Sequence, residues 1–224
     1  RLDIRVPSVD QKLCAKRGHV LSVSLVAIFN GVDENGGILA GSNPRSVLYA
    51  VYRFLRLNGC RFLYPGVDGE HIPIRDIEPT VYHKMADHRF RGHCNEGAES
   101  QTCMLETIDY YAKQELNVYM MEFDIPFYYY NSYYDHENNE KNRVPEPVSH
   151  DQVIQWKRQC EAEISKRGLQ FHDMGHGWTA EAFGLDSKGG WRAQKDCYVP
   201  PESVQYLAQV GGQRKLFGDI PLNT

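Results

Sequence analysis

The chain has 224 residues and a formal net charge of −4, with acidic and basic residues interspersed and no basic stripe. This balance argues against a nucleic-acid partner, and the apolar and charged fractions are those of an ordinary globular protein. No apolar run approaches the roughly 18 residues that a membrane span needs. A signal sequence could have been cleaved before Arg1, so the sequence leaves the compartment open between cytoplasmic and secreted or periplasmic.

Six cysteines are scattered along the chain without close pairs. This spacing argues against a CxxC zinc or redox motif and against a disulfide-rich scaffold, so most are expected to be buried thiols. Cys94 lies between His93 and Asn95 at a predicted strand end and could be a nucleophile or a ligand, although no family signature surrounds it.

Residues 1–80 predict a small α/β domain. The clearest signal is a helix that Ser42 or Asn43 can cap, with Pro44 in its first turn and Gly59 at its end. The other expected elements are strands over 20–29, 37–41 and 61–64, a turn-rich stretch over 30–37, and a domain boundary within 76–84.

Residues 86–224 alternate between strand and helix patterns, which predicts parallel strands with right-handed crossovers. The expected elements are strands over 88–92, 117–123 and 169–174, helices over 100–114, 149–166 and 200–210, and a tyrosine-rich loop over 124–148. A doubly wound sheet and a (β/α)8 barrel both fit, and polar side chains at the strand ends favour the barrel. Because a barrel takes roughly 250 residues, we expect the first strands and helices of an incomplete TIM barrel here.

The stretch LQFHDMGHGW (169–178) is the most informative in the chain. An apolar run breaks into His172, Asp173, His176 and Trp178, which is typical of a buried strand that delivers polar side chains into a pocket at its C-terminal end. The structural alternative is a satisfied core histidine beside a packed tryptophan.

Other polar residues close the two preceding strands. Glu122 and Asp124 are two residues apart and would face the same side of their strand. Arg91 could bind paired hydroxyls or form a surface ion pair, and Glu96 could bind the ligand or cap the following helix. The predicted substrate-binding set is Arg91, His93, Glu96, Glu122, Asp124, His172, His176 and Trp178.

Two further features leave alternatives open. The tyrosine run over 127–134 could stack on sugar rings, pack beneath a loop, or form a subunit interface in an oligomer. His172 and His176 would share one face of a helix for zinc, but the glycines between and beside them argue against a helix. We predict no cofactor and no metal, with a metal-dependent sugar isomerase or hydrolase as the rival.

Residues 41–73 (GSNPRSVLYAVYRFLRLNGCRFLYPGVDGEHIP) resemble the N-terminal α/β domain that precedes the barrel in α-glucuronidases and family-20 hexosaminidases. HRFRGHCNEG (88–97), LQFHDMGHGW and DIPLNT (219–224) look like parts of an uncharacterised group of bacterial glycoside-hydrolase-like proteins. The resemblance implies a carbohydrate-active protein, in particular a glycoside hydrolase that acts on a poly- or oligosaccharide. A noncatalytic carbohydrate-binding or scaffold protein is the alternative.

The family-20 resemblance also implies roles for single residues. Arg91 looks like the arginine that binds hydroxyls of the cleaved sugar, and Asp124 with His176 looks like the pair that supports the catalytic acid. The catalytic carboxylates of that family close the fourth strand, which would lie beyond Thr224 in the remainder of the barrel, so the acid and base are not named here.

Overall fold

The computed structural model describes residues 27–95, 99–121, 126–136, 143–173, 205 and 209–214. The chain forms two compact units. The first comprises Arg1–His93, Thr102–Tyr119 and Cys160–Phe171, and the second comprises Cys94–Gln101, Met120–Gln159 and His172–Thr224. The first unit thus combines N-terminal residues with parts of the strand-and-helix region, and the division into domains 1–80 and 86–224 stays a prediction.

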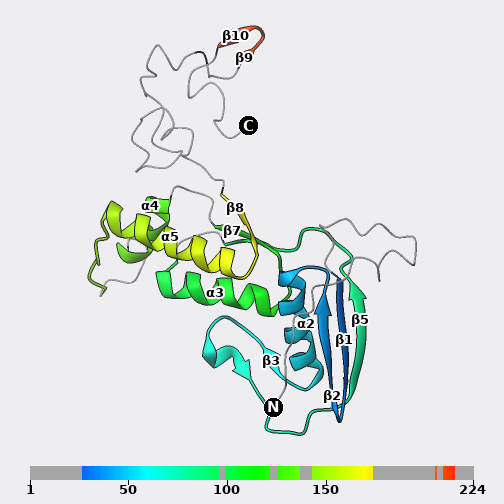
Figure 1. Cartoon of the computed structure of the whole chain (residues 1–224). Helices are drawn as coiled ribbons and strands as arrows, with labels where there is room; N and C mark the ends of the chain where they lie inside the picture. The colour runs from blue at the N-terminus through cyan, green and yellow to red at the C-terminus, as the bar shows by residue number, and fades with distance from the viewer. Residues whose placement is uncertain are drawn as a thin grey trace. The chain divides into compact units, whose positions relative to one another are not determined.

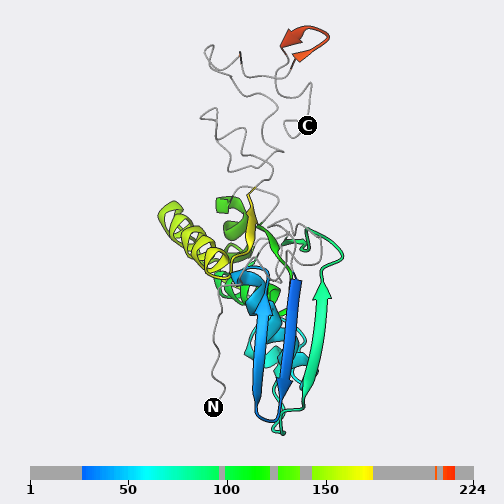
Figure 2. The ribbon, with the colours of Figure 1, turned by 45° about the vertical axis from the view of Figure 1, so that its right-hand side comes forward.

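An antiparallel three-stranded sheet lies in the first unit, in the order β2-β1-β5 (Figures 1 and 2). Its strands are β1 (Ala27–Asp33), β2 (Gly36–Gly41) and β5 (Thr80–Met85). The turn-rich prediction over 30–37 was wrong up to Asp33, because Asn30 and Val32 continue the burial alternation of β1. The stretch expected to hold the domain boundary contains β5, which pairs along β1.

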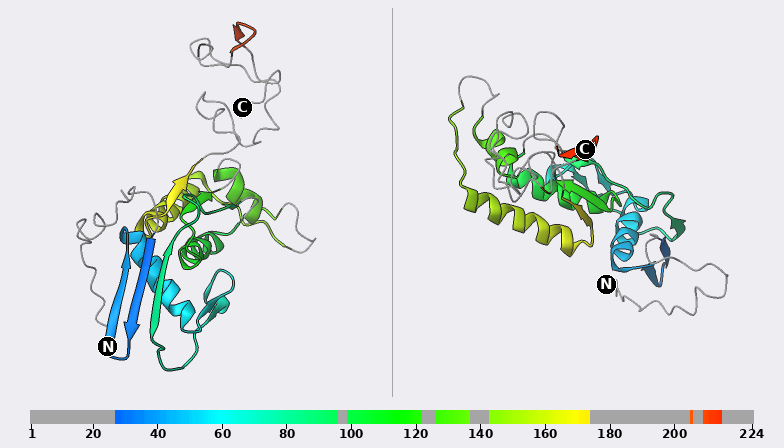
Figure 3. Two further views of the ribbon diagram at one scale, coloured as in Figure 1. Left: turned by 90° about the vertical axis from the view of Figure 1, so that its right-hand side faces the viewer. Right: turned by 90° about the horizontal axis from the view of Figure 1, so that it is seen from above.

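Helix α2 (Pro44–Leu57) confirms the predicted helix and covers one face of this sheet (Figure 3). Its N-cap is Asn43, whose Oδ1 accepts a 2.9 Å hydrogen bond from the Ser46 amide. Buried apolar side chains of the helix and the sheet form one core, which consists of Ile28, Val32, Leu39, Tyr49, Ala50 and Phe54. After α2 the chain forms a short ribbon of β3 (Arg61–Phe62) and β4 (Glu70–His71), joined by the 3-10 turn η1 (Val67–Gly69).

The strand-and-helix region forms a second three-stranded sheet in the order β6-β7-β8. Its strands are β6 (Cys94–Asn95), β7 (Val118–Met121) and β8 (Gln170–His172), and its connecting helices include α3 (Gln101–Lys113) and α5 (His150–Lys166). β6 and β7 are parallel, with Cys94 opposite Met120, as the alternating pattern predicted. The chain is therefore α/β in its helix and strand content.

The strand predicted over 88–92 was wrong in position, because the first strand of this sheet is β6 at 94–95. The residues just before β6 are held by hydrogen bonds to Asn117 instead of by a regular strand ladder. The Arg91 amide donates to Oδ1 of Asn117 at 2.7 Å, and the Arg91 carbonyl accepts from the amides of both Asn117 and Val118.

The tyrosine-rich loop predicted over 124–148 was wrong for its first part, which forms α4 (Pro126–Tyr134). Proline fits a first helical turn, and burial of Tyr129 and Tyr130 stabilises the helix. The helix predicted over 200–210 was wrong at its end, where β9 (Gln209–Val210) pairs with β10 (Gln213–Arg214) across two glycines with positive φ. Among the described segments, no helix combines the length and apolar character needed to cross a membrane.

Two buried asparagines differ in how their amides are satisfied, and this difference predicts opposite mutational effects. Asn30 is fully buried, and neither end of its amide has a hydrogen-bond partner among the described residues. Asn117 is almost as buried, but its Nδ2 donates to the Arg89 carbonyl and its Oδ1 accepts from the Arg91 amide, both at 2.7 Å.

Asn30→Leu should raise the free energy of unfolding by about 1 kcal/mol, because an unpaired buried amide is removed from an apolar core. The matched Asn117→Leu should lower it by about 2–4 kcal/mol, because two main-chain groups lose their partner. Urea denaturation of both variants measures the difference. Equal destabilisation by the two substitutions would contradict the contrast.

Asp109 on α3 predicts a specific acid sensitivity. Burial would raise the pKa of its carboxyl, but hydrogen bonds from Lys113 and Arg167 hold that pKa below its ordinary value. The resulting stability is therefore present above about pH 4 and is lost as the pH falls through the folded-state pKa.

Asp109→Asn should therefore lower the free energy of unfolding at pH 7 by about 1 kcal/mol and make the remaining stability less sensitive to acid. Denaturation between pH 7 and pH 2.5 measures this, with exposed Asp68→Asn as the control. An unchanged acid dependence in Asp109→Asn would contradict the assignment.

Candidate functional site

The predicted site residues fall into two groups in the structure. Arg91, His93 and His172 belong to the described residues, whereas Glu96, Glu122, Asp124, His176 and Trp178 lie outside them. The prediction that Arg91, Asp124, His172, His176 and Trp178 line one concave pocket therefore stays a prediction, as do the supporting roles of Asp124 and His176.

His93 and His172 lie at the predicted strand ends. His93 directly precedes β6, its side chain is exposed, and its ring packs against that of Tyr111 with 4.6 Å between centroids. The Tyr111 hydroxyl donates to the His93 carbonyl at 3.1 Å, so a buried helix side chain fixes the backbone at this point. His172 is the last residue of β8 and is exposed.

Asp173 follows β8 directly, and Nζ of Lys157 lies 2.8 Å from its Oδ2. This pair connects α5 to the carboxyl end of β8. The pair fixes one polar group at the strand end where the sequence predicts a pocket.

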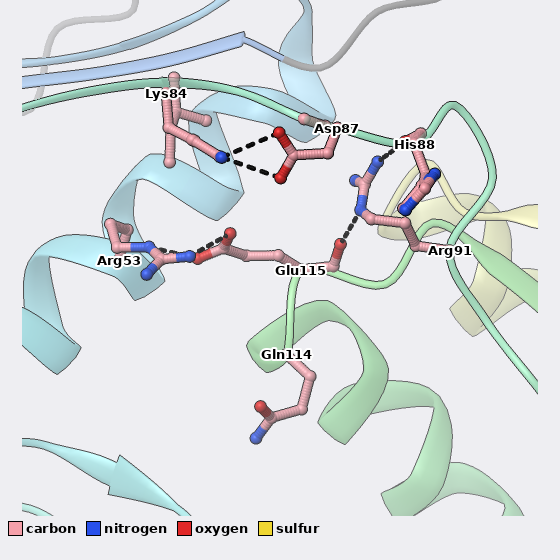
Figure 4. Close-up of a pocket in the computed structure, with 9 residues that line it drawn as sticks. Arg53, Lys84, Asp87, His88, Arg91, Gln114 and Glu115 are labelled. Atoms are coloured by element: carbon pink, nitrogen blue, oxygen red, sulfur yellow. Dashed lines mark hydrogen bonds and ion pairs between the residues drawn. The ribbon is translucent and has the colours of Figure 1, made fainter.

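Arg91 lies where β7 begins, not where it ends. Its Nε donates to the Glu115 carbonyl at 3.1 Å and its Nη1 to the His88 carbonyl at 2.7 Å (Figure 4). Glu115 precedes β7, so the guanidinium is directed toward the amino end of that strand. The predicted sugar-binding role of Arg91 stays a prediction, and these contacts do not support it.

The side chain of Arg91 borders a pocket of about 250 Å³ within the first unit. Most of the lining side chains are polar or charged, and they come from α2, from β5 and the residues after it, and from the residues after α3. The pocket is lined by Ile28, Arg53, Lys84, Ala86, Asp87, His88, Arg91, Gln114 and Glu115.

The two carboxylates of this pocket are paired with cations. Glu115 accepts two hydrogen bonds from Arg53, at 2.9 and 2.8 Å, and it also pairs with Arg56. Lys84 holds both oxygens of Asp87, and this hydrogen bond lowers the pKa of the Asp87 carboxyl and raises the pKa of the Lys84 ammonium.

Arg91 differs from the other cations of the pocket. It is half-buried, and this burial lowers the pKa of its guanidinium. No carboxylate among the described residues pairs with it. Sequence reasoning missed this pocket because its charged residues are up to 62 positions apart, as in the Arg53–Glu115 pair. The positive φ of Glu115, which places its side chain at this pocket, is not evident from the sequence either.

Part of the tyrosine run is packed inside the protein. Tyr129 and Tyr130 are buried, the ring of Tyr130 packs against Trp156 at 5.2 Å, and the Tyr130 hydroxyl donates to Oε1 of Gln101 at 2.7 Å. The ring of Tyr134 stacks on the same tryptophan at 5.1 Å. These contacts favour the packing alternative for the buried tyrosines.

Within the described part of the chain, no three or more His, Cys, Asp or Glu side chains group as metal ligands. Cys60, Cys94, Cys103 and Cys160 are thiols and form no disulfide, and Cys60 and Cys160 are buried as expected.

No protein-family model and no curated protein matches the chain. Solved structures show a partial likeness to glycoside hydrolases. CpGH84B shares 13% sequence identity with a TM-score of 0.40, over 73% of this chain and 25% of that protein.

Two structures of a family 89 glycoside hydrolase from Clostridium perfringens share 13% identity over 68% of this chain and 21% of those chains. One is a double variant of CpGH89 in complex with its substrate GlcNAc-α-1,4-galactose, at a TM-score of 0.40, and the other is a complex with PUGNAc, at 0.41. The chain thus spans about a quarter or less of these proteins. A likeness of this degree carries no argument about its function.

Proposed function

We propose that this chain is part of a glycoside hydrolase that acts on a poly- or oligosaccharide, with its sugar site at the carboxyl ends of β6, β7 and β8. The observation that carries the proposal is the arrangement of these strands. β6 and β7 are parallel with α3 between them, and β8 follows α5 and lies next to β7. In barrels built from such units, catalytic and binding residues come from the carboxyl ends of several strands.

The polar residues at these ends support a sugar site. His172 and Asp173 follow or close β8, and Lys157 fixes Asp173. Glu122 and Asp124 come directly after β7 in the sequence. Carboxylates and imidazoles suit hydroxyl recognition and the support of a catalytic acid.

The remaining residues take the roles that the family-20 resemblance implies. Asp124 and His176 would polarise an acid supplied by the rest of the barrel, Trp178 would offer a flat face to a sugar ring, and Glu96 would bind hydroxyls. The catalytic carboxylates would lie beyond residue 224. Arg91 is not needed for this site.

Asp124→Asn in the full-length gene product tests the proposal. With aryl glycosides and oligosaccharides as probes, we expect turnover at least about tenfold lower than in the parent protein, because an uncharged amide no longer orients and polarises the histidine. Sugar binding measured by calorimetry should change much less, and Asp135→Asn, which alters an exposed carboxylate after α4, is the matched control.

Three results would count against this function. Unchanged turnover in Asp124→Asn would show that Asp124, which follows β7, does not support the catalytic acid. Sugar binding without any hydrolysis in the parent protein would indicate the noncatalytic alternative. Stoichiometric zinc that is lost together with activity on chelation would indicate the metal-dependent rival.

A further inference from the structure

The pocket beside Arg91 has an unbalanced charge. Three cationic side chains, Arg53, Lys84 and Arg91, line it together with only two carboxylates, those of Asp87 and Glu115. Both carboxylates already have cationic partners at hydrogen-bond distance, and Glu115 is shared with Arg56 as well. No acidic group among the lining residues therefore remains for Arg91.

The Arg91 guanidinium is half-buried, and no carboxylate among the described residues pairs with it. A charged group that leaves water needs a counter-charge or a full set of hydrogen bonds. The two carbonyl acceptors of Arg91 engage its Nε and Nη1, and no described group accepts from its Nη2. A half-buried guanidinium thus retains donors and a charge that the described residues do not match.

The lining side chains favour an anion in this space. In Figure 4 the Arg91 guanidinium reaches the His88 carbonyl, and the Arg53–Glu115 and Lys84–Asp87 pairs also line the pocket. A guanidinium has a planar set of donors that matches the oxygens of carboxylates and phosphates. The pocket volume of about 250 Å³ suits a small ion or one charged group of a larger molecule.

We propose that this pocket binds a small oxyanion, a carboxylate or a phosphate group, with Arg91 as its principal ligand. The anion supplies the counter-charge that Arg91 lacks and accepts from the Nη2 donors. Lys84 and Arg53 stay in their ion pairs with Asp87 and Glu115, so the unmatched charge of the pocket belongs to Arg91. This site lies at the amino end of β7 and is independent of the sugar site proposed at the carboxyl ends of the strands.

The probes are sodium phosphate and sodium acetate, titrated into the 224-residue chain at constant ionic strength with chloride as the balancing anion. Calorimetry gives the affinity, and the NMR signal of the Arg91 Nε proton gives the location. Stronger binding of phosphate or of acetate identifies which of the two groups the site prefers, and saturable binding of either one supports the proposal.

Arg91→Met should weaken the binding of the preferred anion by about tenfold or more, because a charge-assisted hydrogen bond is lost. Arg89→Met is the matched control, because it removes the same charge two residues away. The Arg89 side chain is exposed and lies over the ring of Phe90, so its loss should leave the affinity within about twofold. Asp87→Asn should strengthen binding by about two- to fivefold, because it removes an exposed negative charge and releases Lys84.

Asp87→Asn keeps the test valid if Arg91→Met does not fold, because the Asp87 carboxylate is exposed and its ion pair is with Lys84. Absence of saturable binding by both probes in the parent chain would overturn the proposal. Equal losses in Arg91→Met and Arg89→Met, or weaker binding in Asp87→Asn, would overturn it as well, because the attraction would then be a general effect of surface charge.

Discussion

The hydrogen bonds of Asn117 are the constraint on which the parallel sheet depends. Its side chain joins the Arg89 carbonyl to the Arg91 amide, its own amide donates to the Arg91 carbonyl at 2.8 Å, and its carbonyl accepts from the Gln170 amide at 2.8 Å. A single buried residue therefore joins the segment before β6 to the residues just before β7 and β8.

Glu115 has a comparable role for the N-terminal helix. Its positive φ turns the chain sharply after α3, which brings its carboxylate to Arg53 and Arg56 on α2 and its carbonyl to Arg91. The Tyr49 hydroxyl adds a 2.5 Å hydrogen bond to the Leu116 carbonyl, and burial raises the pKa of that phenol. These contacts are why the first unit contains both the N-terminal sheet and the start of β7.

The two proposed sites follow from the direction of β7. Its carboxyl end leads to Glu122 and Asp124, the acidic residues of the proposed sugar site, while its amino end carries Glu115 and the pocket that Arg91 borders. At the amino end, Glu115 pairs with Arg53 and Arg56 and so connects α2 to the residues before β7.

The sequence alone determined the elements whose signals are local. Asn43 and Pro44 start α2, Ser149 and Gly168 bound α5, and the apolar run of β7 lies between two helical patterns, because capping and periodicity act within a few residues. The tertiary structure decided what depends on distant partners. Burial of Tyr129 and Tyr130 turned a predicted loop into α4, the side chain of Asn117 replaced a strand ladder at Arg91, and pairing with β1 made β5 part of a sheet. The direction of the Arg91 side chain also belongs to this second class, because it depends on carbonyls that only folding brings together.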